Sequence, residues 1–297
     1  MDIRSLLMGL AFAAMWSSAF TSARIIVAAA PPLSALALRF LISGLLAIVI
    51  ARMLGQSWRL TRAQWRATII FGICQNALYL GLNFVAMQTV EASLAAIIAS
   101  TMPLLVALAG WLFLGDRLRP LSLIGLLAGV AGVALIMGAR FGGAFDPYGV
   151  ALCVVGALAL AVATLALRGA MTGGNLLMVV GLQMMVGSVV LWPFALGFET
   201  VQIVWSTKLV LAFLYTTVVP GLAATLVWFL LVNRIGAVRA ATFHFLNPFF
   251  GVAIAAAILG ETLGLLDILG VAVIAAGILA VQLSKLPAQT QSKQQKL

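Results

Sequence analysis

Long apolar segments follow one another along almost the whole chain, separated only by short turns. A helix needs ~20 apolar residues to cross the ~30 Å hydrocarbon core of a bilayer. Of the 297 residues, 64% are hydrophobic and only 8% are charged, whereas soluble domains are about half apolar and about a quarter charged. The apolar runs are too long, and alternate too little, for the strands of a membrane barrel. The sequence therefore predicts an all-α integral membrane protein.

Ten of these segments are long enough to span. We expect transmembrane helices at 5–28, 33–54, 64–88, 91–114, 120–139, 147–168, 175–196, 208–233, 236–259 and 264–284. Turn residues, such as the prolines at 31 and 32, separate them. The first segment exceeds the ~7–15 residues of a signal peptide's apolar region, so we expect it to be retained. The polar stretch 287–297 is expected to be a disordered cytoplasmic tail.

Positive charge collects at one end of the expected helices. The side that holds the N-terminus carries thirteen of the 17 basic residues, and the opposite loops carry three, which are Arg24, Arg140 and Lys208. Cytoplasmic loops carry an excess of Lys and Arg. We therefore expect a multi-pass protein of the cell (inner) membrane with both termini in the cytoplasm. Basic helix ends also explain the net charge of +10 better than a nucleic-acid partner does.

The second half of the sequence repeats features of the first at an offset of 145 residues. The matched pairs are Pro103 and Pro248, Gly115 and Gly260, Asp116 and Glu261, Leu118 and Leu263, Gly125 and Gly270, and Gly132 and Gly277. Each half has five helices, an odd number, so the second half must lie inverted relative to the first. We expect five-helix repeats at 1–140 and 146–286. Inverted repeats place a substrate site near the membrane midplane, between the halves.

Two stretches resemble the drug/metabolite transporter superfamily, and specifically its ten-helix EamA-type exporters. Residues 14–20 read Ala-Met-Trp-Ser-Ser-Ala-Phe, similar to a Trp-Gly-Ser motif of that family, with Ser17 in place of the glycine. Residues 228–277 are similar to the family's second-half signature, and Asp116 departs from the commoner glutamate of the first-half turn. Within the family, the chain looks most like the YddG-type exporters of aromatic and other amino acids. The resemblance implies alternating access, a central cavity and export of small metabolites.

Acidic residues are missing from the middle of every expected helix. All seven, Asp2, Glu91, Asp116, Asp146, Glu199, Glu261 and Asp267, lie at helix ends or in loops. Proton-coupled exporters of cations need a buried carboxylate, because such a group is costly in the membrane and is kept for function. A polar but uncharged cavity therefore favours a neutral or zwitterionic substrate.

Polar residues within the expected helices are the candidate substrate-binding groups. His244 and Asn247 lie three residues apart in helix 236–259 and share one face. Gln75, Tyr79 and Asn83, spaced by four residues, form a stripe on helix 64–88. Each set either lines the cavity or joins packed helices by hydrogen bonds, and we favour the cavity. His244 is also the one candidate for proton coupling.

Aromatic residues and prolines complete the candidate site. Trp16, Phe20 and Trp228 lie well within helices and are expected to line an aromatic cavity, although core packing is the alternative. Thr101 precedes Pro103 and is expected to bind substrate or to cap carbonyls freed by that proline. Pro103 and Pro248 are expected to be hinges, because an intrahelical proline bends its helix.

Two further features concern helix ends and helix packing. Arg39 lies about two turns into helix 33–54, and we favour its side chain snorkelling outward over its contacting a substrate carboxylate. Gly125 and Gly129 have the spacing that permits close helix contact, either within a scaffold or across a dimer face. The cysteines, Cys74 and Cys153, are interpreted as packing residues.

The sequence as a whole predicts a secondary transporter that exports small neutral or zwitterionic metabolites, with amino acids including aromatic ones as the leading class. A sugar-nucleotide or phosphate-ester exchanger of the same superfamily is the alternative, but it should place several basic residues in the cavity. An intramembrane enzyme is a distant alternative, because no catalytic cluster is present. We expect no cofactor and no metal, the lipid bilayer as partner, and a monomer or homodimer.

Overall fold

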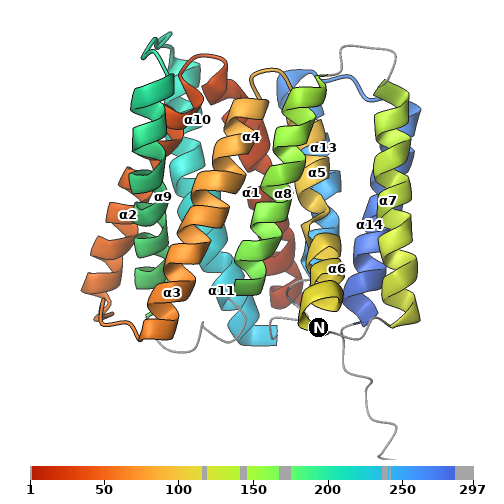
Figure 1. Ribbon diagram of the computed structural model, residues 1–297, viewed down its shortest axis with the longest axis horizontal. Helices are drawn as coiled ribbons and strands as arrows, with labels where there is room; N and C mark the ends of the chain where they lie inside the picture. Colours follow the sequence, from red (N-terminus) through yellow and green to blue (C-terminus); the bar gives the residue numbers. More distant parts are fainter. Residues whose placement is uncertain are drawn as a thin grey trace, which may run out of the picture.

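The computed structural model describes residues 2–115, 119–140, 146–166, 175–235, 240 and 242–284, and all regular structure within them is helical. The helices stand side by side (Figure 1), with α2 and α9 at one edge and α7 and α14 at the other. They are α1 Ile3–Val27, α2 Pro32–Met53, α3 Arg62–Phe71, η1 Gly72–Leu80, α4 Gly81–Ala86, α5 Ala92–Ser100, α6 Met102–Leu114, α7 Pro120–Arg140, α8 Pro147–Ala166, α9 Leu176–Phe198, α10 Thr207–Val218, η2 Val219–Ala223, α11 Ala224–Ile235, η3 Thr242–Leu246, α13 Asn247–Leu259 and α14 Leu265–Ser284.

The helices have the length and surface of membrane spans. Eight of those described are long and apolar enough to cross a bilayer, and two shorter apolar helices, Pro120–Ile136 and Phe243–Leu259, accompany them. Large apolar side chains face outward, including Phe113, which is 81% exposed, and Leu196, which is 74% exposed. A bilayer accepts such a surface, whereas water does not. The prediction of an all-helical, multi-pass membrane protein is therefore confirmed.

Two of the predicted continuous helices are interrupted, which corrects the expected ranges 91–114 and 236–259. The first breaks at Thr101 into α5 and α6, and the second passes from the 3₁₀ turn η3 into α13 at Asn247. In each case a proline, Pro103 or Pro248, follows at the second position of the new helix. Proline lacks the N–H that would donate the next backbone hydrogen bond of the preceding helix, and its ring collides with the carbonyl four residues back. Each break therefore falls one or two residues before the proline at which a simple bend was expected.

Two other predicted helices contain a π-helical section. The span Arg62–Ala86 is π-helical through η1, and the span that begins at Thr207 is π-helical through η2, which contains Pro220. A π-turn is wider than an α-turn and is frequent at functional sites. Hydropathy alone does not distinguish it from an α-helix, so neither π-helical section was predicted.

Element boundaries recur in the two halves at the offset found in the sequence. Helix α6 runs from residue 102 to 114 and α13 from 247 to 259, so both ends differ by 145. Each ends in a glycine with left-handed backbone, Gly115 with φ 69° and Gly260 with φ 70°. That conformation favours glycine because it has no Cβ. Asp116 and the tail 287–297 lie outside the described residues.

Glycines allow two pairs of helices to pack backbone against backbone. A Cβ at Gly125 of α7 would lie 2.5 Å from the carbonyl oxygen of Gly277 in α14, and a Cβ at Gly277 would lie 2.6 Å from that of Gly125. Gly44 of α2 and Gly181 of α9 face each other in the same reciprocal way, at 3.1 and 3.0 Å. The glycines of α7 therefore serve a contact within the chain.

We expect Gly125→Val to destabilise the protein by about 1–3 kcal/mol, because the added side chain forces α7 and α14 apart. The measurement is thermal unfolding of the purified protein in detergent. Gly197→Ala is the control, because nothing lies within 4 Å of a Cβ at that position. Equal unfolding temperatures for the two variants would contradict the close contact.

Candidate functional site

A cavity lies among the helices, beside the second half of α1. Its empty volume is about 660 Å³, part of which is open to the surroundings. Helices α1, α2, η1, α4, α9, η2 and α11 supply its wall. The lining residues are Trp16, Ala19, Phe20, Ala23, Arg39, Phe40, Gln75, Asn76, Tyr79, Leu80, Asn83, Phe84, Met87, Gln183, Met184, Pro220, Gly221 and Thr225. Aromatic rings and uncharged amides therefore dominate the wall.

The π-helical section η1 widens the face that this span presents to the cavity. Gln75 and Tyr79 line the cavity as the predicted stripe requires, but so does Asn76, one position further on. Asn76 also donates a hydrogen bond from Nδ2 to the carbonyl oxygen of Gln183 in α9, at 2.8 Å. The polar residues of this span were expected either to line the cavity or to join packed helices by hydrogen bonds. The structure shows both arrangements, because Gln75, Asn76 and Tyr79 line the cavity and Asn76 also joins η1 to α9.

Arg39 does not snorkel to the surface, which corrects the favoured expectation. Its side chain lines the cavity and is only 5% exposed. The guanidinium carbon lies 5.3 Å from the centre of the Phe40 ring. A Cβ at Gly221 of η2 would lie 3.5 Å from a terminal nitrogen of Arg39. The cavity therefore contains one buried cation close to the backbone of η2.

An aromatic cluster, consisting of Phe12, Trp16, Trp228 and His244, adjoins the cavity. The ring of Phe12 lies 5.8 Å from Trp16, 4.7 Å from Trp228 and 5.3 Å from His244, between centroids. Trp16 belongs to both the cluster and the cavity wall. Phe12 precedes Trp16 by about one turn of α1, so the cluster lies on the side of the cavity nearer the beginning of that helix. Edge-to-face and tilted rings at these distances pack favourably.

The structure thus divides the predicted site residues into two groups. Those on the cavity wall are Trp16, Phe20, Gln75, Tyr79 and Asn83, and those away from it are Thr101, Trp228, His244 and Asn247. Asn247 donates a hydrogen bond from Nδ2 to Nδ1 of His244, at 2.9 Å, and both side chains are buried. Thr101 donates to the carbonyl oxygen of Ile98 at 2.7 Å, which matches its alternative role as a cap. Substrate binding by this second group stays a prediction.

Sequence reasoning missed the contribution of α9 and η2 to the cavity. Gln183 and Met184 come from α9, Pro220 and Gly221 come from η2, and Thr225 comes from the first turn of α11. Gln183 carried a usable signal, because it is a polar residue within an apolar span. The others carried none, since small and apolar residues in such a helix do not distinguish a wall from a packed core.

A second, more open cavity lies at the end of the bundle remote from Asp2. Its empty volume is about 1190 Å³, and Arg24, Lys208, Glu91 and Glu261 contribute charges of both signs to its wall. Two glutamates cap helices at this end. Glu199 accepts hydrogen bonds from two first-turn N–H groups of α2, at 2.7 and 2.8 Å, and Glu261 accepts two from α5, at 2.8 and 3.0 Å. Carboxylates stabilise helix N-termini in this way.

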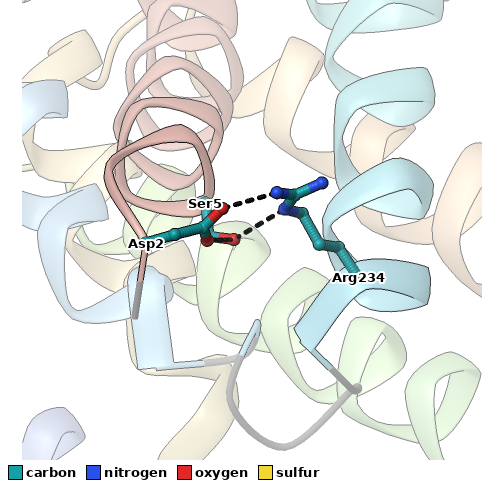
Figure 2. Close-up of polar contacts among 3 residues, drawn as sticks. All are labelled: Asp2, Ser5 and Arg234. Atoms are coloured by element: carbon teal, nitrogen blue, oxygen red, sulfur yellow. Dashed lines mark hydrogen bonds and ion pairs between the residues drawn. The ribbon is translucent and has the colours of Figure 1, made fainter.

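At the opposite end of the bundle, an ion pair joins the start of α1 to the end of α11 (Figure 2). Arg234 Nη2 lies 2.5 Å from Asp2 Oδ2, and Arg234 Nε donates to Ser5 Oγ at 3.2 Å. Ser5 in turn donates to Asp2 Oδ1. The guanidinium and the hydroxyl hold the pKa of the Asp2 carboxyl well below its usual range, and the same pair raises the pKa of Arg234.

Sequence comparison agrees with this architecture. The EamA-like transporter family matches the chain twice, over residues 3–138 and again over 147–283. The chain belongs to the EamA-like transporter family. The predicted resemblance is therefore confirmed, and membership identifies the protein as a membrane transporter.

Relatives of this EamA protein are transporters from bacteria and other organisms. It is 29% identical to the uncharacterized transporter YvbV of Bacillus subtilis, covering 95% of this chain and 90% of that one. It is 27% identical to the uncharacterized inner membrane transporter YedA of Escherichia coli, covering 91% and 88%. A 115-residue stretch is 33% identical to the aromatic amino acid exporter YddG of Ancylobacter novellus, covering 39% and 40%. The fold is similar to that of a solved crystal structure, with a TM-score of 0.66 at 23% identity over 96% of this chain and 98% of the other.

The ion pair between Asp2 and Arg234 predicts a small, pH-dependent contribution to stability. Because folding lowers the pKa of Asp2, the contribution is present above the unfolded pKa of about 3.9 and is lost as the pH falls below it. Asp2→Asn should therefore lower the unfolding temperature slightly at pH 7, and the difference should shrink in acid.

Thermal unfolding at a series of pH values measures this difference. We expect it to be small, because Arg234 and Asp2 are 41% and 48% exposed and water screens the pair. A difference that is largest in acid would contradict the assignment.

Proposed function

We propose that this protein is a secondary transporter that exports small neutral or zwitterionic metabolites, with amino acids including aromatic ones as the leading substrates. The observation that carries the proposal is the cavity among the helices, walled by aromatic rings and uncharged amides. Rings accommodate an apolar or aromatic side group, and amides supply hydrogen bonds to polar groups. A relative that matches part of the chain is named an aromatic amino acid exporter, which favours the same class.

We infer that the chain crosses the membrane ten times, as two inverted five-helix halves. The family matches each half separately, and the helix boundaries recur at a constant offset. Contacts at the two ends of the bundle support the inversion. Arg24, at the end of α1, meets the carbonyl of Met87 near the end of α4, whereas Asp2, at the start of α1, meets Arg234 near the end of α11. The third span of one half therefore ends where the third span of the other half begins.

The proposed location is the inner membrane, with both termini in the cytoplasm. The excess of basic residues on the N-terminal side supports this orientation, and one relative is named an inner membrane transporter. In this orientation the second cavity, with charges of both signs, faces outward. The aromatic cluster lies between the central cavity and the cytoplasm.

Alternating access follows from inverted halves around a central site. We propose that the halves rock about the cavity, that the aromatic cluster closes it toward the cytoplasm, and that the interrupted helices α5–α6 and η3–α13 bend at Pro103 and Pro248. Exchange of a sugar nucleotide or phosphate ester is less well supported, because Arg39 is the one basic residue among the described side chains that line the central cavity. A phosphate needs several such donors.

Transport into liposomes tests the proposed substrate class. Purified protein should carry labelled phenylalanine or tryptophan, and a pH gradient should show whether protons are coupled. Trp16→Ala and Tyr79→Ala should lower the rate by about tenfold or more, because each removes contact area worth about 1.5 kcal/mol or more to a bound ring.

Trp205→Ala is the matched control, since Trp205 is 75% exposed and lies outside both cavities. Transport of a sugar nucleotide but of no amino acid would overturn the proposed class. Transport unaffected by either cavity substitution would overturn the proposed site.

The hinge role of the two prolines has its own test. Pro103→Ala with Pro248→Ala should lower the transport rate while leaving equilibrium binding of substrate nearly unchanged, because the continuous helices would resist bending. Normal transport by this double variant would contradict the role. Pro193→Ala is the control, because Pro193 lies within α9, on the exposed side of the bundle.

A further inference from the structure

The guanidinium of Arg39 is a buried positive charge without a matching negative charge. It lies about 10 Å along α2 from the first residue of that helix, and its side chain is 5% exposed. Its Nε has no hydrogen-bond partner. None of the acidic residues that the structure describes lines the same cavity. A charge buried without a partner is strongly unfavourable, and in membrane helices such residues mark substrate pathways.

A second buried atom in the same wall also lacks a hydrogen-bond partner, but it is an acceptor rather than a donor. Asn83 Nδ2 donates to the carbonyl oxygen of Tyr79 at 2.8 Å, which fixes the orientation of the amide. The other end of that amide, Oδ1, is a buried acceptor with no donor. Five buried side-chain atoms in the described residues lack a partner, and only those of Arg39 and Asn83 belong to cavity-lining residues. An unpaired acceptor is also costly to bury.

These two residues together complement a zwitterion. A guanidinium pairs with a carboxylate through charge-assisted hydrogen bonds, often two in parallel. An amide oxygen accepts a hydrogen bond from an ammonium group, which has three N–H donors and no acceptor. Trp16, Phe20 and Phe84 supply an apolar, aromatic part of the same wall. Carboxylate, ammonium and an apolar side group are the three parts of an α-amino acid.

We propose that Arg39 is the specificity-determining residue of this cavity, that it binds the carboxylate of the substrate, and that Asn83 Oδ1 accepts a hydrogen bond from its ammonium group. This assignment rests on the proposed function, and it narrows the substrates from small neutral metabolites to molecules with a free carboxylate. A molecule with the same ring but no carboxylate leaves Arg39 unpaired and is rejected.

Binding of matched ligands to the wild-type protein in nanodiscs provides the first test. The probes are L-phenylalanine, L-phenylalaninamide, which lacks the carboxylate, and 3-phenylpropionate, which lacks the ammonium. Loss of a charge-assisted hydrogen bond costs a factor of about 10–100 in affinity. We expect the amide to bind weaker than phenylalanine by that factor, and phenylpropionate to bind weaker by a smaller one.

Variants then assign the discrimination to its residue. Arg39→Gln should reduce phenylalanine affinity to about that of the amide and leave the amide unchanged, whereas Arg39→Lys should restore part of the loss. Asn83→Leu should instead remove the preference for phenylalanine over phenylpropionate. Arg52→Gln is the matched control, because it removes one positive charge from the exposed end of the same helix.

A third readout needs no ligand. If Arg39 is unpaired, Arg39→Gln should raise the unfolding temperature of the empty protein, because it removes an uncompensated buried charge. A lower unfolding temperature would show that Arg39 has a structural partner and would overturn the assignment.

The outcomes separate the two proposals. Equal binding of phenylalanine and its amide to the wild type, or unchanged phenylalanine binding by Arg39→Gln, overturns the role of Arg39 while amino acid transport stands. If neither phenylalanine nor any of the other common amino acids binds or is transported, the proposed substrate class fails, and the assignment fails with it.

Discussion

The hydrocarbon core of a bilayer supplies no water to an unpaired N–H or C=O group, and this constraint governs where the chain can depart from an α-helix. The break between α5 and α6 lies inside the bundle. At the break between α5 and α6, the Ser100 hydroxyl donates a hydrogen bond to the carbonyl oxygen of Ala96. The Thr101 hydroxyl donates one to the carbonyl oxygen of Ile98. Ser100 is 5% exposed, so the interruption is shielded from lipid. Irregular backbone is tolerated at membrane depth because neighbouring helices surround it.

Regular and irregular helices occupy different places in the bundle. The pairs α7 with α14 and α2 with α9 are uninterrupted and pack through reciprocal glycine contacts at the two edges (Figure 1). The breaks and both π-helical sections belong to the spans between these edges. Close backbone contact leaves little freedom to slide, because every displacement costs van der Waals contacts. The edges thus hold regular helices in close backbone contact, and the middle holds the segments that depart from a regular α-helix.

Much of this arrangement could be predicted from the sequence. Long apolar runs indicated the helices, and the matched prolines and glycines indicated the repeat, because these residues impose specific backbone geometry. The residues of the candidate site were harder to predict than the fold. Gln75 and Asn83 stood out as polar residues among apolar ones, but the depth of Arg39 did not reveal which way its flexible side chain would point. The separation of His244 and Trp228 from the cavity depends on the packing of α11 against α1 and η3, for which the sequence carries no periodic signal.

In the proposed transport cycle, the single cation of the central cavity would also link binding to movement. While the cavity is empty, rocking of the halves would carry an uncompensated charge past apolar side chains, where the interaction with water is weakest. A bound carboxylate would neutralise that charge, and the apolar part of the proposed ligand would fill the space between the rings. The loaded protein can then change conformation at a lower electrostatic cost than the empty one. Differential stabilisation of this kind lets a substrate shift the equilibrium between two states, and the same side chain would select the substrate and favour its passage.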